Sequence, residues 1–181
     1  MNQIYESQAK PSAIKFGLLY GLLLIVGFVL VYFLKIDAQQ NPAIGRFLSI
    51  CSYFIFPILL IYFGIQHFKK NNTNLISFSN CLKIGVSIAF VGAVLFAIFT
   101  TIFSKSFPEY EKEILQQTKQ IILQQNPKTT ALELQNQIDL SRKFSSPFLS
   151  IPFTILLFSF LGLVYAVIIG LLVRNQQNKL N

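Results

Sequence analysis

Four long stretches without a charged residue alternate with polar stretches along this 181-residue chain. Residues 16–34, 47–65, 84–103 and 148–173 contain no Asp, Glu, Lys, Arg or His, and they are 19, 19, 20 and 26 residues long. Since a helix rises about 1.5 Å per residue, about 20 apolar residues cross a hydrocarbon core of about 30 Å. The pattern predicts an all-α, polytopic membrane protein in which residues 1–181 form a single domain of four transmembrane helices.

Two other fold classes fit the pattern less well. The helices of a soluble bundle would carry polar residues on one face at helical spacing, whereas these stretches are apolar on all sides. Soluble β-sheet would show apolar and polar residues alternating with a period of two, and this alternation is absent. We expect transmembrane helices.

The polar segment 104–147 is the only sizeable part outside the predicted spans. Apolar residues recur at three- to five-residue intervals after Pro108, which predicts an amphipathic helix that Asn126 and Pro127 interrupt. Thr130 and Glu133 then have the spacing of a capping box, which predicts the start of a second helix. We expect an extracytoplasmic helical hairpin between the third and fourth spans.

Small residues four positions apart form stripes on three of the predicted spans. This spacing lets two helix backbones approach closely in lipid. The first span carries Gly17 and Gly21, the third carries Gly85, Ala89, Ala93 and Ala97, and the fourth carries Gly162, Ala166 and Gly170. We expect the third and fourth spans to pack against each other through these stripes, with a homodimer seam as the alternative.

Local signals give five further expectations. Residues 1–15 are polar and should be frayed, and the turn-forming residues Asn41, Pro42 and Gly45 predict a turn before the second span. Pro57 lacks a backbone N–H and should kink that span. Since no charged residue lies within the span, we expect the kink to serve helix packing and not a transport site.

Tyr20 lies near one end of the first predicted span, where tyrosine prefers the membrane interface. That span is longer than the apolar region of a signal peptide, so we expect it to be retained.

The composition agrees with a membrane protein and argues against a nucleic-acid partner. Hydrophobic residues make up 53% of the chain and charged residues only 12%, with a net charge of +8. A nucleic-acid-binding protein would gather its basic residues on one face. Here they flank the apolar stretches, as at Lys83 and Arg174, where they can reach lipid headgroups. The lipid bilayer is therefore the expected partner.

The orientation depends on one basic turn between the second and third spans. If the amino terminus is inside, the inner segments carry seven Lys and Arg residues against eight outside, but Lys119 and Lys128 lie too far from the spans to count fully. Lys69, Lys70 and Lys83 in the turn then decide the balance. We expect both termini in the cytoplasm and the chain in an inner membrane.

No set of residues predicts catalysis, a metal site or a cofactor. Cys51 and Cys81 should lie on opposite sides of the bilayer and behave as small apolar residues. His67 has no motif of metal ligands or nucleophile around it, so a headgroup-facing histidine is expected. Glu109, Glu111 and Glu113 fall on different helix faces and do not form one cation clamp. We therefore expect a protein that is not an enzyme.

Three segments resemble a known family. These are YGLLLIVGF at residues 20–28, FGIQHFKKN leading into ISFSNCLKIG at 63–85, and FSSPF at 144–148. They resemble the bacterial membrane proteins catalogued as domain-of-unknown-function family 4199. The resemblance implies four helices, both termini inside and a large outer loop, and it implies no activity.

Two function hypotheses follow. The first is a non-catalytic scaffold or accessory subunit that acts through helix packing, with a membrane-protein partner or a second copy of the chain. The alternative is a passive channel or permease for a small neutral solute, because Pro57 interrupts a span and the polar residues within the spans are uncharged.

Overall fold

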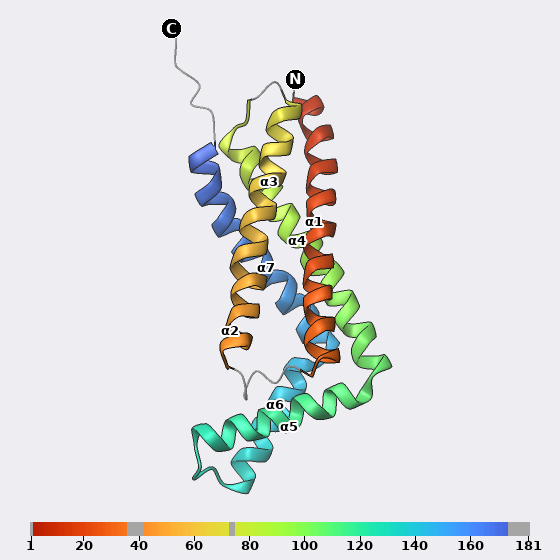
Figure 1. Cartoon of the computed structure of the whole chain (residues 1–181), viewed down its shortest axis with the longest axis vertical. Coiled ribbons are helices and arrows are strands. Elements are labelled where there is room, and N and C mark those ends of the chain that lie inside the picture. Colours follow the sequence, from red (N-terminus) through yellow and green to blue (C-terminus); the bar gives the residue numbers. More distant parts are fainter. Residues whose placement is uncertain (1, 36–41, 73–74, 174–181) are drawn as a thin grey trace. The chain divides into compact units, whose positions relative to one another are not determined.

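All regular elements in the described part of the chain are helices. The computed structural model describes residues 2–35, 42–72 and 75–173, with side chains described from Pro11 onward except at Pro42. In chain order the helices are α1 (Asn2–Phe33), α2 (Pro42–Ile50), the π-helical turn η1 (Cys51–Ile55), α3 (Phe56–Asn71), α4 (Phe78–Ser106), α5 (Pro108–Gln125), α6 (Ala131–Ser145) and α7 (Pro147–Val173) (Figure 1).

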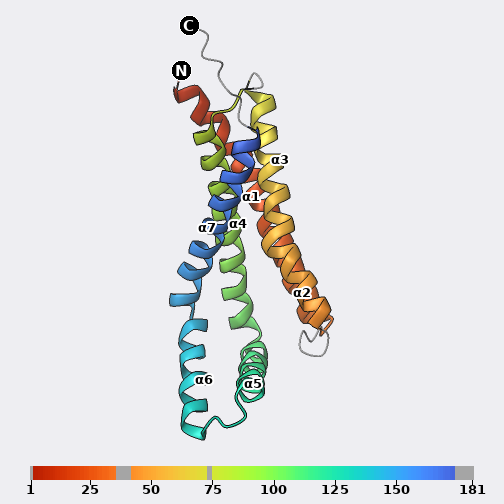
Figure 2. The same cartoon turned by 90° about the vertical axis from the view of Figure 1, so that its left-hand side faces the viewer.

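Four helical stretches are long and apolar enough to cross a membrane. They are Pro11–Phe33, Ala43–Asn71, Phe78–Ser106 and Pro147–Val173, and each overlaps one of the apolar stretches of the sequence. The second stretch runs through α2, η1 and α3, which Figure 2 shows as one continuous rod. The prediction of an all-α chain with four transmembrane helices is confirmed.

The chain divides into two compact units. Residues 1–96 and 155–181 form one, which we call the bundle unit, and residues 97–154 form the other, which we call the loop unit. Helices α4 and α7 each begin in one unit and end in the other. The loop unit contains α5 and α6, which contact each other.

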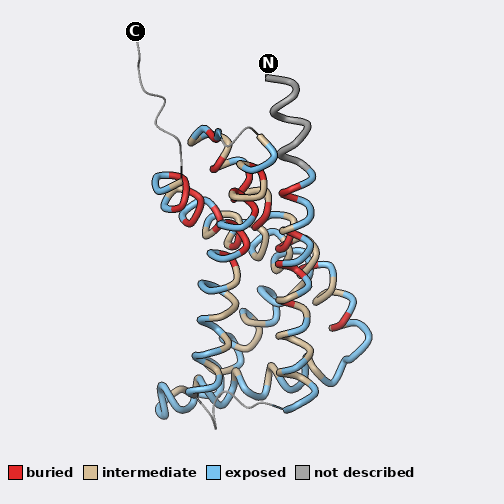
Figure 3. Tube along the Cα trace, turned by 45° about the horizontal axis from the view of Figure 1, so that its top comes forward, coloured by how far each residue is buried: buried red, intermediate tan, exposed pale blue. Residues whose placement is uncertain are grey.

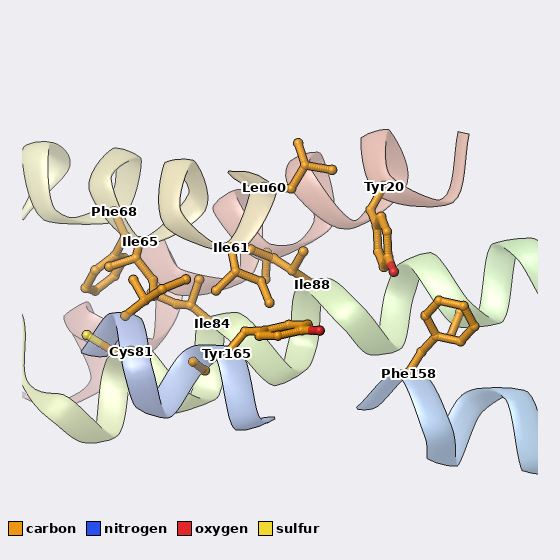
Figure 4. Packing of buried hydrophobic residues seen from close by; sticks show 14 of the residues in the cluster. Tyr20, Leu60, Ile61, Ile65, Phe68, Cys81, Ile84, Ile88, Phe158 and Tyr165 are labelled. Atoms are coloured by element: carbon orange, nitrogen blue, oxygen red, sulfur yellow. The ribbon is translucent and has the colours of Figure 1, made fainter. Parts of the chain in front are cut away.

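The core of the bundle unit lies between α1, α3, α4 and α7. Its largest fully buried side chains include Tyr20, Ile61, Ile65, Phe68 and Ile84, contributed by α1, α3 and α4 (Figure 4). Burial is uneven along the helices, as the tube in Figure 3 shows. Neither α2 nor residues 25–33 of α1 has a buried residue among those described.

Two local predictions were wrong at helix starts. Helix α1 begins at Asn2, so residues 2–15 are helical; the buried Ser12 and Ala13 show that packing supports the polar start. Helix α2 begins at Pro42, a residue that suits the first helical position because its missing N–H would be unpaired there anyway. Gly45 therefore lies inside a helix, while Asn41 lies outside the described residues.

Candidate functional site

The second span is interrupted immediately before Pro57. The backbone N–H of Phe56 donates to the carbonyl of Cys51, five residues earlier, as in a π-helix. The carbonyl of Ser52 thereby loses its usual donor, since in an α-helix it would accept from Phe56. The carbonyl of Tyr53 also loses its usual donor, because Pro57 has no N–H to offer.

Two tyrosines from other spans hydrogen-bond to these carbonyls. The Tyr20 hydroxyl of α1 donates to the Ser52 carbonyl at 3.1 Å. The Tyr165 hydroxyl of α7 donates to the Tyr53 carbonyl at 2.8 Å. A carbonyl without a donor is costly in hydrocarbon, so the two hydroxyls make the break compatible with a membrane. We call Tyr20, Ser52, Tyr53, Pro57 and Tyr165 the tyrosine-bridged break.

Aromatic rings fill the space beside the tyrosine-bridged break. Phe158 of α7 stacks on Tyr53 with ring centroids 5.5 Å apart. It also meets Tyr20 edge to face with centroids 6.0 Å apart. Figure 4 shows the side chains of Phe158 and Tyr20. Phe96 of α4 lies 6.5 Å from Phe158. Offset and edge-to-face pairs of this kind stabilise packing beyond the area they bury. The site thus joins all four spans through apolar contacts and two hydrogen bonds.

Tyr20 does not lie where the sequence predicted it, and no local signal identified Tyr165 as a bridging residue. Tyr20 is 1% exposed and lies in the core, so the prediction that it lies at the membrane interface was wrong. The reason is that α1 extends further toward the amino terminus than the apolar stretch does. Pro57 was a usable signal, because a proline inside a span requires another donor for the freed carbonyl.

The structure brings the small residues of α4 and α7 together. A methyl group added at Gly85 would overlap Ala166, and one added at Gly162 would overlap Ala89. Gly170 lies against Cys81, which is buried. The two helices are therefore in close contact, with small residues facing each other.

The glycines of α1 pack against a different part of α4. Gly17 lies against Val91 and Gly21 against Leu95, while Gly92 of α4 lies against Tyr20. The remaining alanines of the α4 stripe, Ala93 and Ala97, are both buried. The α4 stripe therefore lies inside the protein.

His67 has partners that the sequence did not predict. Its Nδ1 lies 2.9 Å from the Ser12 hydroxyl of α1, and its ring meets Phe16 edge to face with centroids 5.7 Å apart. The prediction of a headgroup-facing histidine without a paired residue was wrong in this respect. Serine next to histidine can form a nucleophile and base pair, but Ser12 is only 2% exposed, so a substrate would not reach its hydroxyl. We assign this bond a structural role between α1 and α3.

Lys69 of the basic turn contacts the end of α7. The Lys69 ammonium donates to the carbonyl of Val173 at 3.2 Å. A cation is favourable there, since the last carbonyls of a helix carry partial negative charge. Lys70 and Lys83 are exposed, and Arg174 lies outside the described residues.

In the loop unit, the predicted start of the second helix is confirmed. Thr130 and Glu133 form a reciprocal capping box at the start of α6, and the hydrogen bonds from Thr130 hold the pKa of Glu133 below its ordinary value. Tyr110 of α5 packs edge to face on Phe103, and burial raises the pKa of its phenol. These groups stabilise helix ends and packing.

Neither cysteines nor acidic residues form a site in the described part of the chain. Cys51 and Cys81 are both free thiols, the first half-buried and the second buried. Among the described residues, no three His, Cys, Asp or Glu side chains lie close enough to hold a metal ion. Glu109 and Glu111 lie in the first turn of α5, where negative charge is favourable.

Comparisons with known proteins support one assignment. No curated protein and no solved structure matches this chain. A family model described as "Protein of unknown function (DUF4199)" matches residues 15–175, which include the loop unit, three complete spans and all but the first four residues of the first span. The chain, with its four helices of membrane-spanning length, therefore belongs to this family.

Proposed function

We propose that this protein is a non-catalytic scaffold or accessory subunit of a bacterial inner membrane, with both termini in the cytoplasm and α5 and α6 outside. The observation that carries the proposal is the exposure of α2. Six of its eight described side chains are exposed and none is buried, although the helix belongs to a membrane span. A span that packs only within its own chain would bury one face.

The exposed surface extends beyond α2. Phe33 at the end of α1 is 63% exposed and Phe47 of α2 is 62% exposed. Lipid can cover such side chains, but another helix makes closer van der Waals contacts with them than mobile lipid chains do. This argument supports a membrane-protein partner or a second copy of the chain at α2.

The tyrosine-bridged break favours the scaffold over the channel. A transport site at a broken helix keeps backbone groups available for the solute. Here the carbonyls of Ser52 and Tyr53 already accept hydrogen bonds from tyrosine hydroxyls. The polar groups of the break are thus used to hold the spans together.

The small-residue stripe of α4 is a poor position for detecting a partner, because Ala93 is fully buried. A photo-crosslinking amino acid at Phe47 tests the proposal in native membranes. We expect a discrete crosslinked protein product from Phe47, whose mass separates a partner from a second copy. The matched control is Leu172, which is 80% exposed on α7 and should crosslink mainly to lipid. Crosslinking to lipid alone from both positions would contradict the proposal.

A further inference from the structure

One end of the bundle unit has basic side chains but no described carboxylate. Lys69 and Lys70 lie in the last turn of α3, and Lys83 lies in the second turn of α4. Lys15 of α1 lies one turn after Ser12, which bonds to α3. Every Asp and Glu whose side chain the structure describes belongs to the loop unit. A phosphate group at this end of the bundle unit would therefore meet attractive charges in the described part.

Lys15 and Lys70 lie on adjacent helices, on either side of one hydrogen-bonded pair. Ser12 of α1 bonds to His67 of α3, so these helices touch here. Lys15 lies three positions after Ser12, and Lys70 lies three positions after His67, which places each lysine next to the bonded pair on its own helix. Phe16 links the two sides, because its ring contacts His67 and lies 5.9 Å from the Lys15 ammonium.

His67 adds an uncharged donor to the two lysines. Its Nδ1 faces both the Ser12 hydroxyl and, at 3.5 Å, the amide nitrogen of Asn71. An amide nitrogen only donates, so the Asn71 contact suits the neutral tautomer in which Nδ1 accepts and Nε2 carries the ring proton. That Nε2–H has no hydrogen-bond partner among the described residues. Ammonium and N–H donors together suit a phosphate oxygen.

We propose that Lys15, His67 and Lys70 bind the phosphate of an anionic phospholipid headgroup at the junction of α1 and α3. A lipid is the source that fits the position, because both helices continue from here as apolar spans against which its acyl chains can lie. Basic sites between transmembrane helices bind anionic headgroups in this way. The site is separate from the exposed α2 surface, so it stands independently of the scaffold proposal.

Native mass spectrometry of the full-length protein in mild detergent tests this site. The protein is titrated with phosphatidylglycerol and, separately, with phosphatidylcholine, which carries no net charge. We expect tighter binding of phosphatidylglycerol, and about a 25-fold loss of that affinity in the double variant Lys15→Gln, Lys70→Gln, since each basic residue near an anionic surface contributes about fivefold. Binding of phosphatidylcholine should stay unchanged.

The matched control is the double variant Lys35→Gln, Lys105→Gln. It removes the same charge from the opposite ends of α1 and α4, and both lysines are exposed. The control should keep the wild-type affinity for phosphatidylglycerol. Equal losses in both double variants, or equal binding of the two lipids by the wild type, would overturn the proposal.

Inorganic phosphate separates a lipid site from a site for free phosphate. Added phosphate should leave the phosphatidylglycerol adduct largely intact, because the acyl chains contribute to lipid binding. Complete displacement of the lipid by inorganic phosphate would overturn the assignment to a lipid. A thermal denaturation curve for each variant checks that the protein is folded before its lipid affinity is compared.

Discussion

Single hydroxyl groups stabilise the least regular part of the membrane-spanning region. Replacing Tyr165 with Phe removes the donor to the Tyr53 carbonyl but keeps the ring. We expect the free energy of unfolding to fall by about 1 kcal/mol, because interhelical hydrogen bonds in membranes contribute about 0.6 and at most about 1.7 kcal/mol. Denaturation in mixed micelles of detergent and sodium dodecyl sulfate measures this loss.

Two comparisons make the tyrosine experiment specific. Tyr62→Phe is the control, because Tyr62 is exposed and its hydroxyl makes no hydrogen bond in the described part; its stability should not change. In a Pro57→Ala background, residue 57 regains an N–H for the Tyr53 carbonyl, so Tyr165→Phe should cost less. The same cost in both backgrounds would show that the tyrosine does not compensate for the proline.

At the scale of the helices, close contact between α4 and α7 depends on residues without large side chains. Gly162→Ala would place a methyl group where Ala89 already lies, so we expect a loss of about 1–3 kcal/mol in the free energy of unfolding. Gly27→Ala is the matched control, since no atom lies within 4 Å of the added methyl group. Alanine is the better helix former by about 1 kcal/mol, so Gly27→Ala should be neutral or stabilising.

The same denaturation assay compares both glycine variants. Helix propensity favours alanine at both positions. If Gly162→Ala lowers the free energy of unfolding and Gly27→Ala does not, the difference reports the contact between α4 and α7. Equal stability changes at Gly162 and Gly27 would contradict close packing of α4 on α7.

The orientation of the whole molecule should depend on the three lysines of the basic turn. In the proposed orientation, replacing Lys69, Lys70 and Lys83 with Gln removes the small excess of positive charge on the inner side, so mixed topology is expected. Reporter fusions near Asn72 and Gln124 measure it: in the wild type we expect cytoplasmic activity from the first and periplasmic activity from the second. A single, unchanged orientation in the triple variant would show that these lysines are not decisive.

A control variant for the topology experiment removes three positive charges from another part of the chain. Lys112, Lys119 and Lys128 are exposed lysines of α5 and the turn after it. In the proposed orientation this loop lies outside, so replacing all three with Gln lowers the outer positive charge and should leave the wild-type topology in place or strengthen it. Mixed topology in this variant would argue against the proposed orientation.

Features that depend on neighbouring residues could be predicted from the sequence. The four spans follow from the length of the apolar stretches, and the start of α6 follows from Thr130 and Glu133, which are three residues apart. The interruption at Pro57 was also predictable, because it results from a missing N–H. The helical residues before the first apolar stretch were missed, because a polar segment has a weak local preference and the burial of Ser12 and Ala13 depends on tertiary packing.

The sequence by itself determined that the chain is helical and that four of its segments can cross a membrane, because these properties depend on local apolar length. The tertiary structure alone decided which groups complete the site. The Tyr20 and Tyr165 hydroxyls lie 32 and 112 positions from the residues whose carbonyls they reach, and Ser12 lies 55 positions from His67. No local pattern encodes such pairs, since they exist only where packing of the spans brings distant residues within hydrogen-bond distance.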